Sequence, residues 1–178
     1  MFTDARRRRV IFTAHCFLNQ NSISDGTAVY PACFKELVRL MTENEIGIVQ
    51  MPCPELMCLG LDRANPNGAD FPVTVENTRI RHAILEKDKY ARLEQLADSV
   101  IFQILEYRRH GFQILGIVGA NRSPSCGVQT TSDNNEEVPG KGLFIELLEK
   151  KLSEHGIAIP MTGIKSDEDI PKIKDLLK

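Results

Sequence analysis

Residues 114–127 read ILGIVGANRSPSCG, an apolar run that ends in a polar loop around Cys126. Short continuous apolar runs of this kind are typical of strands that are covered on both faces of a parallel sheet. Runs of the same character occur at residues 10–14, 47–51 and 157–161. We therefore expect a sheet of about four strands, in which residues 114–119 form the third.

Helical patterns alternate with these runs. Apolar residues recur at spacings of three and four, as on one face of a helix, over residues 34–41, 93–104, 143–148 and 170–177. Strands that alternate with helices indicate βαβ units and a parallel sheet. The sequence thus predicts a Rossmann-like three-layer α/β fold with helices on both faces, as one domain over residues 1–178. We expect residues 1–9 to be a flexible basic N-terminus and residues 65–88 to be an irregular insertion or lid.

Length and composition indicate how many domains the chain forms and which partners and cross-links are expected. A length of 178 residues fits one domain, and a formal net charge of −2 gives no general attraction to nucleic acid. No apolar run approaches the ~20 residues that cross a bilayer, so we expect a cytoplasmic protein with no membrane partner. Five cysteines, none in a CxxC pair, argue against a disulfide framework in that reducing compartment. The sequence does not indicate an oligomeric state.

Three of the cysteines follow predicted strands. Cys16, Cys53 and Cys126 come shortly after the first, second and third strand. Ligands of open parallel sheets bind beyond the carboxyl ends of the strands, so we expect the three loops to meet there. Three thiolates suit an iron–sulfur cluster with one open iron, or a zinc ion with a fourth ligand such as His15 or water. Simple burial of free cysteines also explains the pattern.

The loops around these cysteines carry further polar groups. Pro52 and Pro54 stiffen the loop at Cys53, where Glu55 either transfers a proton or caps the next helix. Residues 121–127 surround Cys126 with hydroxyls and a glycine. Their amides either bond an anion or cluster sulfides, or form an ordinary polar turn.

Taken in order, the motifs resemble the bacterial thiouracil desulfurase (desulfidase) family. Cys16 precedes Asp25-Gly26 by nine residues, Cys53-Pro54-Glu55 follows, and residues 123–127 read SPSCG. The resemblance covers roughly residues 10–159. It implies a [4Fe-4S] cluster on Cys16, Cys53 and Cys126, which an aerobic preparation can lack.

The resemblance also implies an activity, which is removal of sulfur from a thiolated pyrimidine or similar small thio-compound, with release of sulfide. Proton transfer would fall to Glu55, Ser123 and Ser125, and the substrate side would include Asp25, Asn19 and Arg63. The alternative is a zinc-binding or cluster-carrying domain that binds or senses a small molecule without turnover.

The chain departs from the family pattern near the expected pocket. Asn19 and Cys58 stand where the family usually has glycine, and residues 65–87 are unlike the usual pattern. We expect Cys33 to be a packing residue and Cys58 to be a buried or idle thiol, with an extra ligand or a sulfur relay as the alternative for Cys58.

Overall fold

The computed structural model describes residues 2–177 and contains a four-stranded parallel sheet in the order β2-β1-β3-β6. This confirms the expected α/β fold with its mainly parallel sheet. The strands of this sheet are β1 (Arg9–Thr13), β2 (Gly47–Gln50), β3 (Gln113–Ala120) and β6 (Met161–Ile164).

The central strands are buried on both faces. Side chains alternate between the two faces of a strand, yet the consecutive residues Ile11 and Phe12 of β1 are both inaccessible to solvent, as are Ile117 and Val118 of β3. The unbroken apolar runs in the sequence therefore reflect two covered faces.

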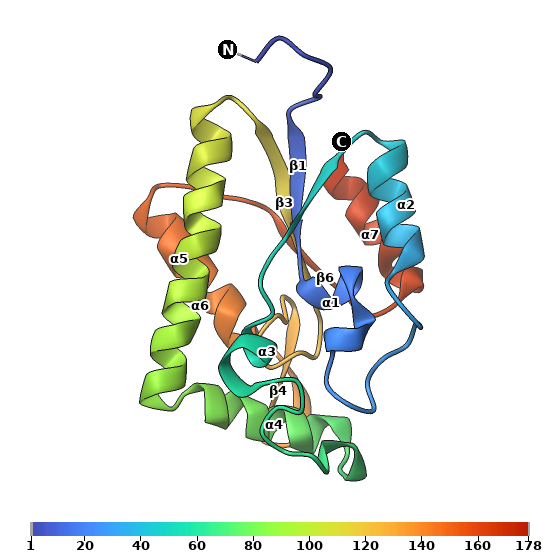
Figure 1. Cartoon of the computed structure of the whole chain (residues 1–178), viewed down its shortest axis with the longest axis vertical. Helices are drawn as coiled ribbons and strands as arrows, with labels where there is room; N and C mark the ends of the chain where they lie inside the picture. The colour runs from blue at the N-terminus through green and yellow to red at the C-terminus, as the bar shows by residue number, and fades with distance from the viewer. Residues whose placement is uncertain (1, 178) are drawn as a thin grey trace.

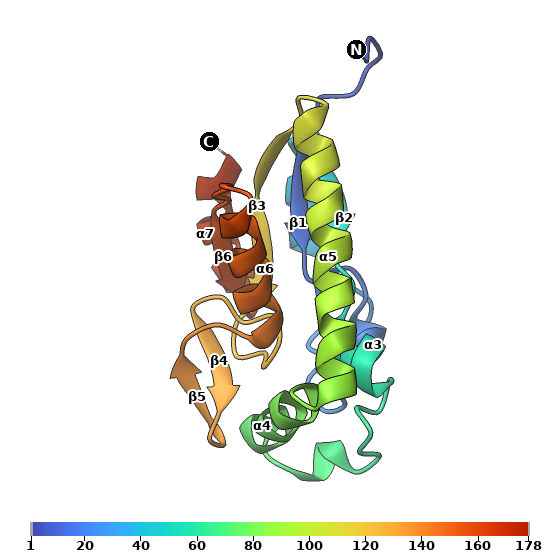
Figure 2. The same ribbon diagram turned by 90° about the vertical axis from the view of Figure 1, so that its left-hand side faces the viewer.

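Helices form the two outer layers (Figures 1 and 2). The long helix α5 and helix α6 pack together on one face, while α2 and α7 lie on the other. The helices are α1 (His15–Leu18), α2 (Lys35–Glu43), α3 (Pro54–Leu59), α4 (Val73–Ile84), α5 (Lys87–Arg109), α6 (Leu143–Glu154) and α7 (Ile170–Lys174). Within residues 2–177, no helix has the length and apolar character needed to span a membrane.

An antiparallel hairpin lies apart from the main sheet. It pairs β4 (Thr130–Asp133) with β5 (Glu136–Pro139) and packs against α4. The hairpin, α4, α3 and α1 all lie at the carboxyl end of the sheet, in the lower half of Figure 1.

The fourth strand begins later than the sequence predicted. The expected strand at residues 157–161 was wrong, because only Met161 belongs to β6, which pairs with Ile117 of β3. Pro160 has no N–H to donate to a ladder, and its carbonyl accepts the N–H of Ile117 at 2.9 Å. The proline therefore marks where regular pairing begins.

The expected irregular segment at residues 65–88 was wrong in its second half. Helix α4 occupies Val73–Ile84, and α5 starts at Lys87. The buried face of α4 begins with three polar residues, Glu76, Asn77 and Thr78, before Ile80 and Ile84 continue it. Those polar residues interrupt the apolar spacing that would have revealed a helix.

The strand order contains a topological switch point. From β1 the chain moves outward to β2, and from β3 it moves outward in the opposite direction to β6. In doubly wound folds, ligands bind in the crevice that opens at such a reversal. Here the crevice lies between the segments that follow β1 and β3, which carry Cys16 and Cys126.

Candidate functional site

Three cysteines line one cavity at this crevice. Cys16 is the second residue of α1 after β1, Cys53 immediately precedes α3 after β2, and Cys126 lies in the loop after β3. All three contribute to the wall of a cavity of about 100 Å³. Drug-sized ligands occupy clefts of roughly 300–1,000 Å³, so this cavity suits a compact group. The sequence placed the three cysteines at strand ends, and the structure brings them together.

The start of α3 fixes Cys53. Its Sγ accepts the backbone N–H of Leu56 at 3.5 Å and so caps the helix, while Pro54 occupies the first turn. Proline is well suited to that position because its missing N–H would have no partner there. The stiff loop expected from the two prolines thus positions the thiol.

The loop around Cys126 is held by its own hydroxyl and by two glycines. Ser123 Oγ accepts the backbone N–H of Cys126 at 3.0 Å. A Cβ on Gly127 would lie 2.2 Å from the carbonyl oxygen of Thr130, and one on Gly142 would lie 2.4 Å from the carbonyl carbon of Ser125. Only glycine permits the backbone to approach these atoms so closely. The residues before α6 therefore pack directly against the cysteine loop.

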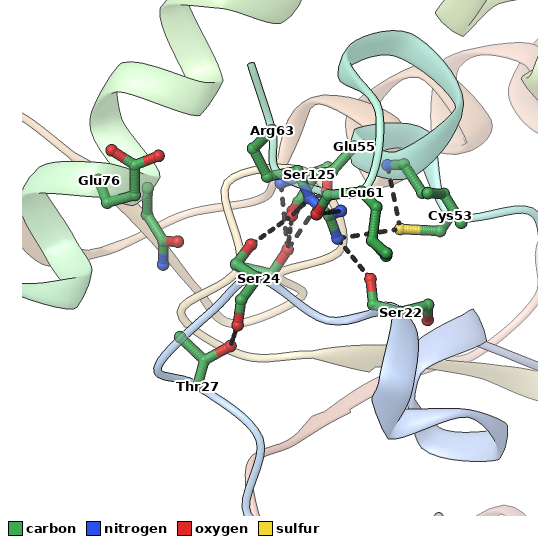
Figure 3. A network of polar contacts seen from close by, with 12 residues as sticks. Ser22, Ser24, Thr27, Cys53, Glu55, Leu61, Arg63, Glu76 and Ser125 are labelled. Atoms are coloured by element: carbon green, nitrogen blue, oxygen red, sulfur yellow. Dashed lines mark hydrogen bonds and ion pairs between the residues drawn. The ribbon is translucent and has the colours of Figure 1, made fainter. Parts of the chain in front are cut away.

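Glu55 is the polar centre of the site (Figure 3). Its Oε1 accepts hydrogen bonds from Ser125 Oγ at 2.6 Å and from Ser123 Oγ at 3.1 Å. Its Oε2 accepts from Ser24 Oγ and from Arg63 Nε, each at 3.2 Å. The side chain is buried. Both oxygens therefore act as acceptors, the role of an ionised carboxylate.

Arg63 is buried behind the carboxylate and is 2% exposed. Besides Glu55, its guanidinium donates to the carbonyl oxygens of Ser22, Gly60 and Leu61 at 2.6–3.1 Å. Its Nη2 also lies 3.8 Å from Cys53 Sγ. The side chain thus connects a buried carboxylate, three backbone carbonyls and one thiol.

Burial disfavours ionisation of the three thiols. It raises the pKa of Cys53 to about 11, with the charge of Glu55 adding to the effect. Burial also raises the pKa of Cys16 and Cys126, and both feel the charge of Cys53. A thiolate is the metal-binding form. In the metal-free protein at neutral pH the cavity therefore holds neutral thiols, and only a positively charged group would stabilise their ionised form.

Other polar residues also contribute to the cavity wall. His15 lines it beside Cys16, and burial together with the charge of Arg63 lowers its pKa. Asn77 of α4 reaches the wall while its amide donates to Arg122 O and Ser132 Oγ. Lys165, which forms an ion pair with Glu137, also contributes.

The other predicted residues lie in different places. Asn19 caps the turn that follows α1 by accepting the N–H of Asn21, and Asp25 is exposed and bonds the N–H of Gly26. Neither contributes to the cavity wall, whereas Arg63 does. Cys58 lies outside the cavity, with its Sγ 3.5 Å from Lys89 O.

Sequence reasoning missed several residues of the site, among them Ser24 and Asn77. Ser24 lies in the polar loop after Cys16, but nothing in the sequence marked it as a partner of Glu55. Asn77 lies on α4, in the segment that was expected to be irregular.

The donor set fits an iron–sulfur cluster. Cysteine thiolates are the usual ligands of such clusters, and three thiols gather here where their charges would repel one another without a cation. Within residues 2–177, no three His, Cys, Asp or Glu side chains are grouped so that they could hold a single metal ion, which argues against a mononuclear site such as zinc and does not bear on a cluster of several irons.

Comparisons with known proteins gave two similar chains, and no family model matches. An uncharacterized protein of Methanocaldococcus jannaschii is 27% identical over 173 residues, which cover 96% of both chains. The solved structure of a [4Fe-4S]-dependent thiouracil desulfidase, TudS, is 16% identical with a TM-score of 0.48, and the match covers 95% of this chain and 97% of that one.

Proposed function

We propose that this chain is an iron–sulfur-dependent desulfurase that acts on a thiolated pyrimidine or similar small thio-compound. Cys16, Cys53 and Cys126 would hold a [4Fe-4S] cluster. The observation that carries the proposal is that three cysteines from three separate segments of the chain share one cavity with the buried carboxylate of Glu55. The resemblance of the three motifs to thiouracil desulfurases supports the same conclusion.

The reaction replaces C=S by C=O. Water supplies the oxygen and two protons, the carbon–sulfur bond breaks, and sulfide leaves as H₂S or HS⁻, so no electrons are gained or lost. When bound, the cluster supplies a Lewis-acidic iron that makes sulfur a better leaving group. All other steps fall to the protein's own side chains.

Ser125 and Glu55 would move the proton. The Ser125 hydroxyl donates to Glu55 Oε1 at 2.6 Å, and its oxygen retains lone pairs that can accept a proton from water. In the proposal, water gives its proton to Ser125 as the serine proton passes to Glu55. Glu55 then returns a proton to the departing sulfur or to the ring. Arg63 keeps the carboxylate oriented through Oε2.

Ser123 would position other groups and would not transfer the proton itself. Its Oγ–H donates to Glu55 Oε1, and its oxygen accepts the N–H of Cys126. It therefore connects the proton-transfer carboxylate to the loop of the third cysteine. We assign it to positioning both, with Ser125 as the nearer relay.

The experiment is anaerobic reconstitution followed by a sulfide-release assay. The wild-type protein should bind iron and acid-labile sulfide and release sulfide from 2- or 4-thiouracil. Serine substitutions of Cys16, Cys53 and Cys126 should each prevent stable cluster binding, while Cys33→Ser and Cys58→Ser should bind it normally. Zinc in place of iron, or a cluster that never releases sulfide from any thiolated base, would overturn the proposed activity.

A further inference from the structure

His15 presents an unused hydrogen-bonding atom at the cavity. It directly precedes Cys16 and lines the same cavity. Its Nδ1 faces the amide nitrogen of Gln50 at the end of β2. Its Nε2 is buried, and no residue in the range 2–177 forms a hydrogen bond with it.

The contact with Gln50 determines which nitrogen carries the proton. An amide nitrogen donates hydrogen bonds and does not accept them. As the side chain of Gln50 is oriented, its amide nitrogen donates to Nδ1 of His15, and this contact assigns the ring proton to Nε2. The unpartnered atom is thus an N–H donor with a defined direction.

A buried donor without an acceptor is costly, so native proteins rarely keep one. Within residues 2–177, no protein acceptor reaches it. An acceptor must then come from whatever the cavity binds. A group held by cysteines presents electron-rich sulfur atoms there.

We propose that His15 donates a hydrogen bond from Nε2 to a sulfur atom of the bound group, with Gln50 holding the ring in the required tautomer. This inference rests on the proposed iron–sulfur function. The acceptor sulfur belongs to the cluster or to the thio-substrate, and hydrogen bonds to cluster sulfurs raise the reduction potential. The same bond to a substrate sulfur would favour the thio-compound over its oxygen analogue.

Two variants separate this role from simple packing. His15→Phe keeps a ring but removes the donor, whereas His15→Gln keeps an N–H donor on a shorter side chain. Exposed His155 offers a control, His155→Phe, far from the cysteines in sequence. The first measurement needs no cluster, because long-range ¹⁵N–¹H spectra of the metal-free protein report the tautomer of His15. We expect the proton on Nε2.

The second measurement is the reduction potential of the reconstituted, substrate-free protein. With a cluster acceptor, His15→Phe should lower the reduced-to-oxidised ratio at a fixed potential about tenfold, a shift of about 59 mV for one electron. His15→Gln should recover most of that shift, and His155→Phe should show none. With a substrate acceptor, the potential stays constant and His15→Phe weakens 2-thiouracil binding about tenfold while uracil binding is unchanged.

The outcomes distinguish the two proposals. A normal cluster whose potential and thiouracil affinity are both unchanged in His15→Phe overturns the role of His15 alone. A proton on Nδ1 of His15 in the metal-free protein would also overturn the role of His15 alone. If the wild-type protein binds neither iron nor sulfide, the proposed function fails and this inference fails with it.

Discussion

Ser125 Oγ lies 2.6 Å from Glu55 Oε1, although 70 residues separate the two in the chain. The bond joins the loop after β3 to the first turn of α3, which follows β2. It is a hydrogen bond to a buried charged group, a kind that contributes roughly 1.5–3 kcal/mol. The contact therefore stabilises the carboxyl end of the sheet, and it would set the geometry of the proposed proton transfer.

Glu55→Gln should abolish proton transfer while leaving the cysteines in place. The amide cannot accept a proton, and general acid–base groups contribute roughly 10²–10⁴-fold. We expect kcat for sulfide release to fall by that amount at an unchanged iron content. Glu94→Gln removes an exposed carboxylate of α5 and is the matched control. Equal activity of the Glu55→Gln and Glu94→Gln variants would assign Glu55 a structural role only.

Ser125→Ala should slow the reaction less than the loss of the carboxylate. Removing one hydrogen bond to a charged group costs about 1.5–3 kcal/mol, which corresponds to roughly 10–100-fold in rate. Steady-state kinetics on the reconstituted variant would measure it. A variant with wild-type kcat would exclude Ser125 as the relay.

Arg63→Lys should destabilise the protein even though the charge is kept. The single ammonium group of lysine cannot reproduce the hydrogen bonds that the guanidinium of Arg63 donates to Glu55 and to three backbone carbonyls. Each buried acceptor left unpaired costs about 1–3 kcal/mol, so we expect the free energy of unfolding in urea to fall by at least that much. Arg92→Lys, at an exposed position of α5, should change it little.

The metal-free protein should lose stability at high pH. Burial raises the pKa of Cys53 from its ordinary value of 9.0 to about 11. The neutral thiol of Cys53 therefore contributes fully to the free energy of unfolding below pH 9. This contribution is lost as the pH rises through about 11, because the thiol of the unfolded chain ionises at lower pH than the thiol of the folded chain. Thermal denaturation between pH 8 and 11 should show this decline, and Cys53→Ser should flatten it. A decline that is equally steep in Cys53→Ser would contradict the assignment.

Gly142→Ala should displace the Cys126 loop. Gly142 has an ordinary φ of −75°, so the constraint is spatial: the added Cβ would meet backbone atoms of Ser125. Overpacking of this kind costs about 1–3 kcal/mol. We expect lower stability and lower iron content, whereas Gly47→Ala, whose Cβ would have its nearest contact at 3.4 Å, should be tolerated. Equal iron content in both variants would show that the loop adapts.

The positions of the cysteines could be predicted because topology determines them. Apolar runs locate strands, parallel strands share a carboxyl edge, and Cys16, Cys53 and Cys126 each follow a strand. The family resemblance placed Ser125 in the same site as Glu55, but the contact of Glu55 with Ser24 could not be predicted, because it spans 31 residues and depends on rotamers and loop paths. Helix α4 was missed because Glu76 and Asn77 occupy its buried face.

The separation of the three cysteines along the chain bears on when the proposed cluster could assemble. Intervals of 37 residues from Cys16 to Cys53 and of 73 residues from Cys53 to Cys126 leave no short segment that could capture iron during synthesis. The chain must first pair β1 with β2 and β3 before the thiols meet. For the proposed cluster, we therefore expect assembly on an already folded protein, so that a shortage of iron would leave an intact apoprotein.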